Sequence, residues 1–200
     1  VLAGNIARGV TEKINAVLWF SDLRGFTRIT ETAEPTAVIP FLNSYSDAVI
    51  SSIHEAGGEV LKLIGDGTLA IFDAADPARG CAMALAAEKA LRARLPALEA
   101  EHRETALPVT TPYIGLHIGK VFYGNVGSRD RLDFTVVGPA VNETSRVAAM
   151  CRSAERDPLM SEAFCAAASD EDRRRFVSVG RYALRGVERP QELFTVDPDA

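Results

Sequence analysis

Short apolar runs that end in polar turns recur along this chain, and their spacing predicts strands between amphipathic helices. Residues 16–20 are too few for a helix and rich in β-branched and aromatic side chains, which indicates a buried strand. Residues 59–64 and 68–72 predict a hairpin with Asp66 in its turn. Asp22 and Asp66 therefore each follow a strand, where polar groups can converge.

Helical periodicity predicts two long helices in the first half of the chain. Residues 36–55 place their apolar side chains along one face. The Ala-rich residues 77–91 predict a second helix, which we expect to be interrupted near Pro96, and residues 99–111 form the least organised segment.

The second half alternates strands with one clear helix. Residues 114–124 predict a glycine-punctuated strand and hairpin, and residues 133–137 predict a strand that leads into a helix near Pro139. Residues 176–182 and 192–196 predict a closing pair of strands. This order fits an α+β fold in which helices cover one face of a mostly antiparallel sheet.

Composition places the chain among single-domain globular proteins. Its 200 residues are 47% hydrophobic and 24% charged, which predicts a lead-in over 1–12 and one domain over 13–200. A net charge of -5 argues against a nucleic-acid partner. The three cysteines lack metal-ligand spacing, so we expect buried thiols in a reducing, cytoplasmic compartment: Cys81, Cys151 and Cys165.

No segment of the sequence is long and apolar enough to cross a bilayer, and no signal peptide opens the chain. The chain begins with Val, so we interpret it as a fragment of a longer protein that carries an upstream sensor or regulatory domain. Whether that protein has a membrane anchor is left open. Among the histidines, we expect His117 to be a satisfied strand residue and His54 and His102 to lie on helix surfaces.

Two segments offer the chemistry of a metal site. Residues 20–27 place Asp22 before Gly25, and the amides from Arg24 to Thr27, Phe26 included, could cradle phosphate oxygens at the start of a helix. Taken alone, either aspartate is better explained as an ordinary turn residue than as a metal ligand. Lys62, on the strand before Asp66, is costly among apolar neighbours unless a partner or ligand uses its charge.

A third segment, residues 133–146, puts Asn142 and Arg146 one helical turn apart on the same face. With the other two it gives Phe-x-Asp-Leu-x-Gly-Phe-Thr, Lys-x-x-Gly-Asp and Val-Gly-x-x-Val-Asn-x-x-Ser-Arg, in that order. These motifs resemble the class III nucleotidyl cyclases, in particular bacterial and soluble adenylate cyclase catalytic domains. The resemblance extends from about residue 15 to 196 and implies a ferredoxin-like, palm-type sheet.

The resemblance also implies an activity: conversion of ATP to cyclic AMP and pyrophosphate with two Mg²⁺ or Mn²⁺ ions per site. Asp22, Asp66 and the Leu23 carbonyl would be the metal ligands. Arg146 would stabilise the reacting phosphate and Asn142 would orient the ribose. Arg185, and one of Arg129 or Arg131, are weaker candidates for the polyphosphate.

The hydrogen-bonding groups of two side chains favour adenine as the base. Lys62 can only donate, which suits the acceptor nitrogen of adenine, and Thr135 can accept from the exocyclic amine. Thr135 is preferred over Asp133 because the family's base-partner position lies three residues before Gly138. A hydroxyl can also donate, so Thr135 leaves the discrimination against guanine weak.

The resemblance implies that each site is shared between two chains of a head-to-tail homodimer. One chain would contribute Asp22 and Asp66, and the other Lys62, Thr135 and the helix with Asn142 and Arg146. Lys62 and Asp66, four residues apart, would then serve different sites. Two alternatives stay open: a guanylate cyclase, and a regulatory domain that binds nucleotide without turnover.

Overall fold

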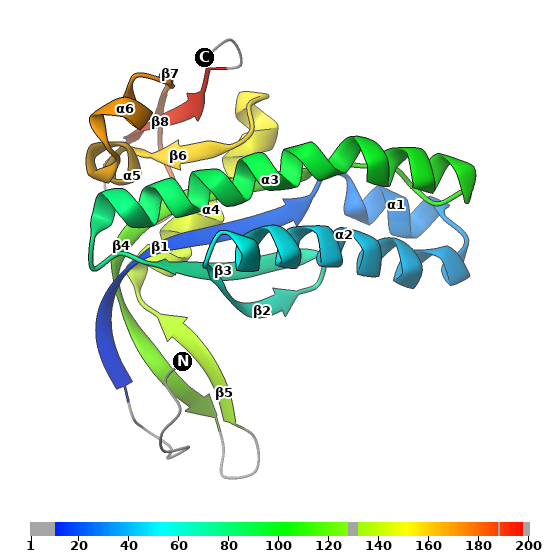
Figure 1. Ribbon diagram of the computed structural model, residues 1–200, viewed down its shortest axis with the longest axis horizontal. Coiled ribbons are helices and arrows are strands. Elements are labelled where there is room, and N and C mark those ends of the chain that lie inside the picture. The colour runs from blue at the N-terminus through cyan, green and yellow to red at the C-terminus, as the bar shows by residue number, and fades with distance from the viewer. Residues whose placement is uncertain (1–10, 128–131, 188, 198–200) are drawn as a thin grey trace.

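A mostly antiparallel sheet forms the centre of the computed structural model (Figure 1). The structure describes residues 11–127, 132–187 and 189–197, and within them the sheet has eight strands. They are β1 (Thr11–Leu23), β2 (Glu59–Ile64), β3 (Gly67–Asp73), β4 (Pro112–Gly127), β5 (Leu132–Val137), β6 (Leu159–Ser161), β7 (Phe176–Tyr182) and β8 (Gln191–Val196). The helices are α1 (Phe26–Thr32), α2 (Pro35–Glu55), α3 (Pro77–Glu104), α4 (Pro139–Ala154), α5 (Glu162–Ala167) and α6 (Asp170–Arg173).

The strand order is β2-β3-β1-β4-β6-β8-β7, and β5 pairs with the far end of β4. Among the strand pairs of the described residues, only β4 and β6 are parallel. The antiparallel β1–β3 register pairs Ser21 with Thr68, and the β1–β4 register pairs Asp22 with Tyr113. These registers bring the end of β1, the β2–β3 turn and the start of β4 to one edge. The α+β fold predicted from the sequence is confirmed.

Helices cover both faces of the sheet rather than the single face expected. Val17 and Trp19 pack with α2 and α3 on one side, whereas Ala16 and Leu18 pack against the other side, which includes Ala140 of α4. All four β1 residues are fully buried because both faces of the strand are covered. This explains why residues 16–20 form an unbroken apolar run.

The prediction of a break near Pro96 is wrong. α3 continues through Pro96 to Glu104, because its buried side chains Leu91 and Leu95 pack against the core that α2 shares. His102 is likewise fully buried rather than exposed. Its ring nitrogens lie 2.7 Å from Ser44 Oγ and 2.6 Å from the Pro108 carbonyl oxygen, so tertiary contacts order the segment that the sequence leaves irregular.

Other element boundaries also differ from the sequence prediction. Residues 114–124 lie within one continuous strand, β4, which turns back only into β5. β1 begins at Thr11, which pairs with Gly124, so the strand starts inside the expected lead-in; residues 1–10 lie outside the described part of the chain. The short elements β6, α5 and α6 have no counterpart in the prediction. Among the described residues, no helix meets the length and hydropathy that a membrane span requires.

Candidate functional site

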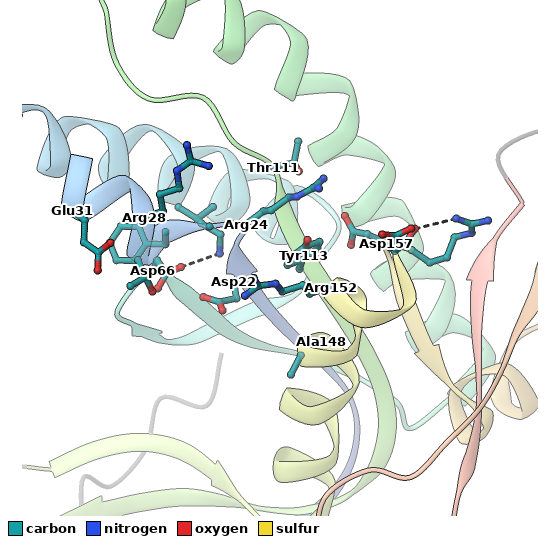
Figure 2. Close-up of a pocket in the computed structure, with 17 residues that line it drawn as sticks. Asp22, Arg24, Arg28, Glu31, Asp66, Thr111, Tyr113, Ala148, Arg152 and Asp157 are labelled. Carbon is teal, nitrogen blue, oxygen red and sulfur yellow. Dashed lines mark hydrogen bonds between the residues drawn. The ribbon is translucent and has the colours of Figure 1, made fainter. Parts of the chain in front are cut away.

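The two predicted metal ligands lie side by side. Asp22 stands near the end of β1, and Asp66 occupies the turn between β2 and β3. The backbone amide of Leu23 donates to Asp66 Oδ2 at 3.0 Å (Figure 2), which fixes the turn against the end of β1. Asp66 is therefore a turn residue, as the sequence predicts.

Electrostatics in this pair favour a bound cation. Partial burial, a hydrogen bond with Asp66 and the negative charge of Asp66 together raise the pKa of Asp22 to about 7, although a hydrogen bond from the Leu23 amide opposes the shift. A divalent ion between the carboxylates would replace the shared proton and remove the repulsion. Within the described residues no third acidic, His or Cys side chain joins them in a metal cluster, so water and phosphate oxygens would complete the coordination.

A cavity of about 1120 Å³ opens beside the carboxylates. Figure 2 shows that its walls come from the end of β1, α1, the start of β4 and the C-terminal half of α4. Its polar side chains carry both signs of charge: Asp22, Asp66, Glu31, Glu155 and Asp157 against Arg24, Arg28, Arg152 and Arg156. The volume and the mixture of charges suit a polyanion bound with cations.

The loop from Arg24 to Thr27 lines this cavity, but not all its amides are available. Gly25 adopts φ 71° and caps α1, a conformation that favours glycine. The Arg24 amide donates to the Thr111 carbonyl at 3.0 Å, so the expectation that it cradles phosphate is wrong. The amides of Phe26 and Thr27 lie in the first turn of α1, where helical amides lack partners within their own helix.

The remaining predicted residues lie elsewhere and do not line the cavity. Lys62 Nζ donates to Asp133 Oδ2 at 2.7 Å, which joins β2 to β5. Thr135, two residues along β5, is 7% exposed. Asn142 is exposed and Arg146 is half-buried on α4. The structure thus separates the predicted residues into a carboxylate group and a second group around β5 and α4.

The loop between β7 and β8 lies against Arg146. Gly186 has φ 71°, and a β-carbon added there would lie 3.3 Å from Arg146 Nη2. Arg185 is exposed and directly precedes this glycine in the loop. The other candidates for the polyphosphate, Arg129 and Arg131, lie outside the described residues.

Sequence reasoning missed the cavity residues of α4 and of the connection that follows it. Arg152 extends from α4 toward Asp22 (Figure 2). Asp157 forms an ion pair with Arg92 of α3 and accepts a hydrogen bond from the Ile114 amide at 2.8 Å. Arg152 and Asp157 lie far along the chain from Asp22 and Asp66 and belong to none of the three motifs, so only the fold reveals the common site.

Comparisons with known proteins identify the family of this chain. The family model described as "Adenylate and Guanylate cyclase catalytic domain" matches residues 10–197. The chain is 35% identical over 160 residues to "Adenylate cyclase" of Anabaena cylindrica and 31% identical over 156 residues to "Adenylate cyclase 1" of Rhizobium meliloti. These alignments cover 79% and 76% of this chain but only 32% and 23% of those proteins.

Solved structures support the same fold. The adenylyl cyclase CyaB from P. aeruginosa superposes with a TM-score of 0.82 at 25% identity, covering 94% of this chain and 95% of that one. The guanylyl cyclase Cya2 gives a TM-score of 0.81 at 27% identity, with 92% of both chains covered. A bacterial light-regulated adenylyl cyclase gives 0.83 at 26% identity, covering 94% of this chain and 53% of that one.

Proposed function

This chain belongs to the adenylate and guanylate cyclase catalytic-domain family, and we propose that it is an adenylate cyclase. The proposed reaction converts ATP to 3′,5′-cyclic AMP and pyrophosphate. The observation that carries the proposal is the Asp22–Asp66 pair, held together by the Leu23 amide at the mouth of a polyanion-sized cavity. Lys62, a side chain that only donates, supports adenine as the base.

The carboxylate group would hold the metal ions. Two Mg²⁺ or Mn²⁺ ions bound there would acidify the ribose 3′-hydroxyl and neutralise charge on the triphosphate. Asp22 and Asp66 provide the hard oxygen ligands that these ions prefer, with the Leu23 carbonyl as a further ligand. The amides of Phe26 and Thr27 and the guanidinium of Arg24 border the same space and would bind phosphate oxygens.

The second group of residues would complete the site of another copy. Arg146 would donate to the reacting phosphate, Asn142 would orient the ribose, and Arg185 would reach the polyphosphate from the loop beside Arg146. Lys62 and Thr135 would bind the base. None of these side chains lines the cavity with Asp22 and Asp66, which supports a site to which each chain would supply only half of the residues.

Exposed apolar side chains support a homodimer. The β4–β5 hairpin, which extends beyond the helices in Figure 1, exposes about half of each of four side chains: Phe122, Val126, Phe134 and Val137. Apolar surface of this kind marks interaction sites in soluble proteins. A head-to-tail dimer that buries the hairpins would form two complete sites.

The first test is a cyclase assay with MgATP, MnATP and the corresponding GTP complexes over a range of protein concentrations. We expect cyclic AMP as the main product and a specific activity that rises with concentration as dimers form. Absence of cyclic AMP at concentrations where the protein is dimeric would contradict the proposal. Cyclic GMP as the main product would favour a guanylate cyclase, the alternative that the similarity to the guanylyl cyclase Cya2 suggests.

A complementation experiment tests the shared site. Asp66→Ala and Arg146→Ala chains should each be inactive as homodimers, because every site lacks one group. In a mixture, heterodimers contain one intact site, so we expect about a quarter of the parent activity for random pairing of equal amounts. Lys89→Ala, an exchange on α3 outside both groups, serves as the matched control. Heterodimers without activity would refute the shared site.

The regulatory context is also a proposal. The chain spans 32% of the length of its Anabaena relative, so we propose that a sensor or regulatory region lies elsewhere in the full protein. We also propose a cytoplasmic location for the catalytic domain, where ATP is available and the buried thiols stay reduced. Binding of a non-cyclisable ATP analogue without turnover of ATP would instead support a silent nucleotide-binding domain.

A further inference from the structure

An ion pair stands beside the residues proposed to bind the base. Lys62 Nζ lies 2.7 Å from Asp133 Oδ2, and the two side chains are 32% and 52% exposed. Their strands are not hydrogen-bonded neighbours, since β2 pairs with β3 and β5 pairs with β4. A half-exposed ion pair contributes little to stability, so its position needs another explanation.

Asp133 and Thr135 lie two residues apart on β5, so both project from the same face of the strand. Thr135 is buried, whereas Asp133 reaches outward to Lys62. A base that touches Thr135 and Lys62 is therefore also within reach of the Asp133 carboxylate. The carboxylate keeps a second oxygen and unused lone pairs for a further hydrogen bond.

Donor and acceptor order distinguishes the two purines at such a pair. Adenine presents its ring acceptor N1 next to a donating amine, which matches a donating Lys62 next to an accepting Asp133. Guanine reverses the order, so its carbonyl would face the carboxylate and its ring N–H would face the ammonium. An ionised carboxylate cannot donate, unlike the Thr135 hydroxyl, and acceptor facing acceptor leaves both groups unpaired.

We propose that Asp133 determines base selectivity in this protein: its carboxylate positions the Lys62 ammonium and rejects the guanine carbonyl. The inference deepens the proposed function and rests on it for the identity of the ligand. The Asp133 carboxylate thus supplies the discrimination between adenine and guanine that the Thr135 hydroxyl alone lacks.

The test replaces the carboxylate by the isosteric amide, Asp133→Asn, because an amide can turn a donor toward the guanine carbonyl. ATP and GTP compete with a fluorescent non-cyclisable ATP analogue in Mn²⁺, and turnover of both nucleotides is measured in parallel. We expect the preference for ATP over GTP, in inhibition constants and in kcat/KM, to fall about tenfold, the effect of one mismatched hydrogen bond. Asp133→Glu, which keeps the charge, should retain most of the preference.

Asp170→Asn is the matched control, since it removes an aspartate from another exposed ion pair, with Arg173 of α6, away from the site. A purely structural role for Asp133 would weaken ATP and GTP alike and leave their ratio unchanged, which would overturn the inference. Asp133→Ser is put through the same binding and turnover assays as Asp133→Asn. The inference can then be tested even if one of the two variants fails to fold. Selective binding that depends on Asp133 without turnover would uphold the inference and refute the cyclase proposal.

Discussion

The contact between β4 and α4 gives the sharpest structural prediction. A β-carbon added at Gly115, near the start of β4, would lie 2.4 Å from the Ala148 amide nitrogen and 2.7 Å from its α-carbon. Ordinary contacts between such atoms are about 3.5 Å, so Gly115→Ala requires α4 to withdraw by roughly 1 Å. The glycine is therefore required by the close approach of the helix, and not by its backbone angles.

We expect two consequences of this displacement. Overpacking should lower the free energy of unfolding by about 1–3 kcal/mol. Because α4 carries Asn142 and Arg146, a shift of about 1 Å should also lower kcat by about 10²-fold, more than the loss of stability alone would cause at 25 °C. Trp19 is the single tryptophan and is fully buried, so its fluorescence in urea reports unfolding, while a cyclase assay reports kcat.

A second glycine on β4 provides the control. A β-carbon at Gly119 would lie 2.7 Å from Ala140 Cβ, a side-chain atom that Ala140→Gly removes. The double variant Gly119→Ala/Ala140→Gly should therefore recover stability, whereas Gly115→Ala/Ala148→Gly should not, because the obstacle there includes backbone. If Gly115→Ala matches the parent in both unfolding free energy and kcat, the reasoning about this contact is refuted.

Three further predictions concern the core, the thiols and the metal ligands. Tyr45→Phe should lower the free energy of unfolding, measured in urea, by about 1–3 kcal/mol, because the buried hydroxyl donates to the Thr110 carbonyl at 2.5 Å and accepts from the Thr110 amide at 2.9 Å. An unchanged midpoint of urea unfolding would contradict this. Burial raises the pKa of all three cysteine thiols to about 12. A disulfide reagent at pH 8 should therefore label no cysteine in the native protein and all three in denaturant. Rapid labelling of the native protein would contradict this, because it would show that a thiol is accessible. Mn²⁺ should raise the Tm of the parent and not of Asp66→Ala, as measured by scanning calorimetry, and an equal rise in both would exclude Asp66 as a ligand.

The hairpin that carries Asp66 was predictable because its signals are local. Alternation, β-branched side chains and a glycine-flanked turn all fall within 15 residues, and the observed β2 and β3 match the predicted ranges closely. The start of α4 at Pro139 was predictable for the same reason, since proline is favoured in the first turn of a helix.

Local signals failed where packing overrides them. Pro96 predicts a helix break, but its cost is offset by the burial of Leu91, Leu95 and His102 against neighbouring elements. The position of Lys62 shows a different limit. The sequence indicates that its charge needs a partner, yet the partner, Asp133, lies 71 residues away on a strand that does not pair with β2.

The sequence by itself determined the class of fold, the strand ends that carry Asp22 and Asp66, and the motifs that identify the family. Each of these depends on residues close together in the chain, where periodicity and turn chemistry act directly. Only the tertiary structure decided that Leu23 links the two aspartates, that the Arg24 amide is already bonded, and that the residues proposed to bind the base lie apart from the carboxylates. Those relations depend on strand register and helix packing, which sum many weak contacts across the whole chain and leave no local pattern to read.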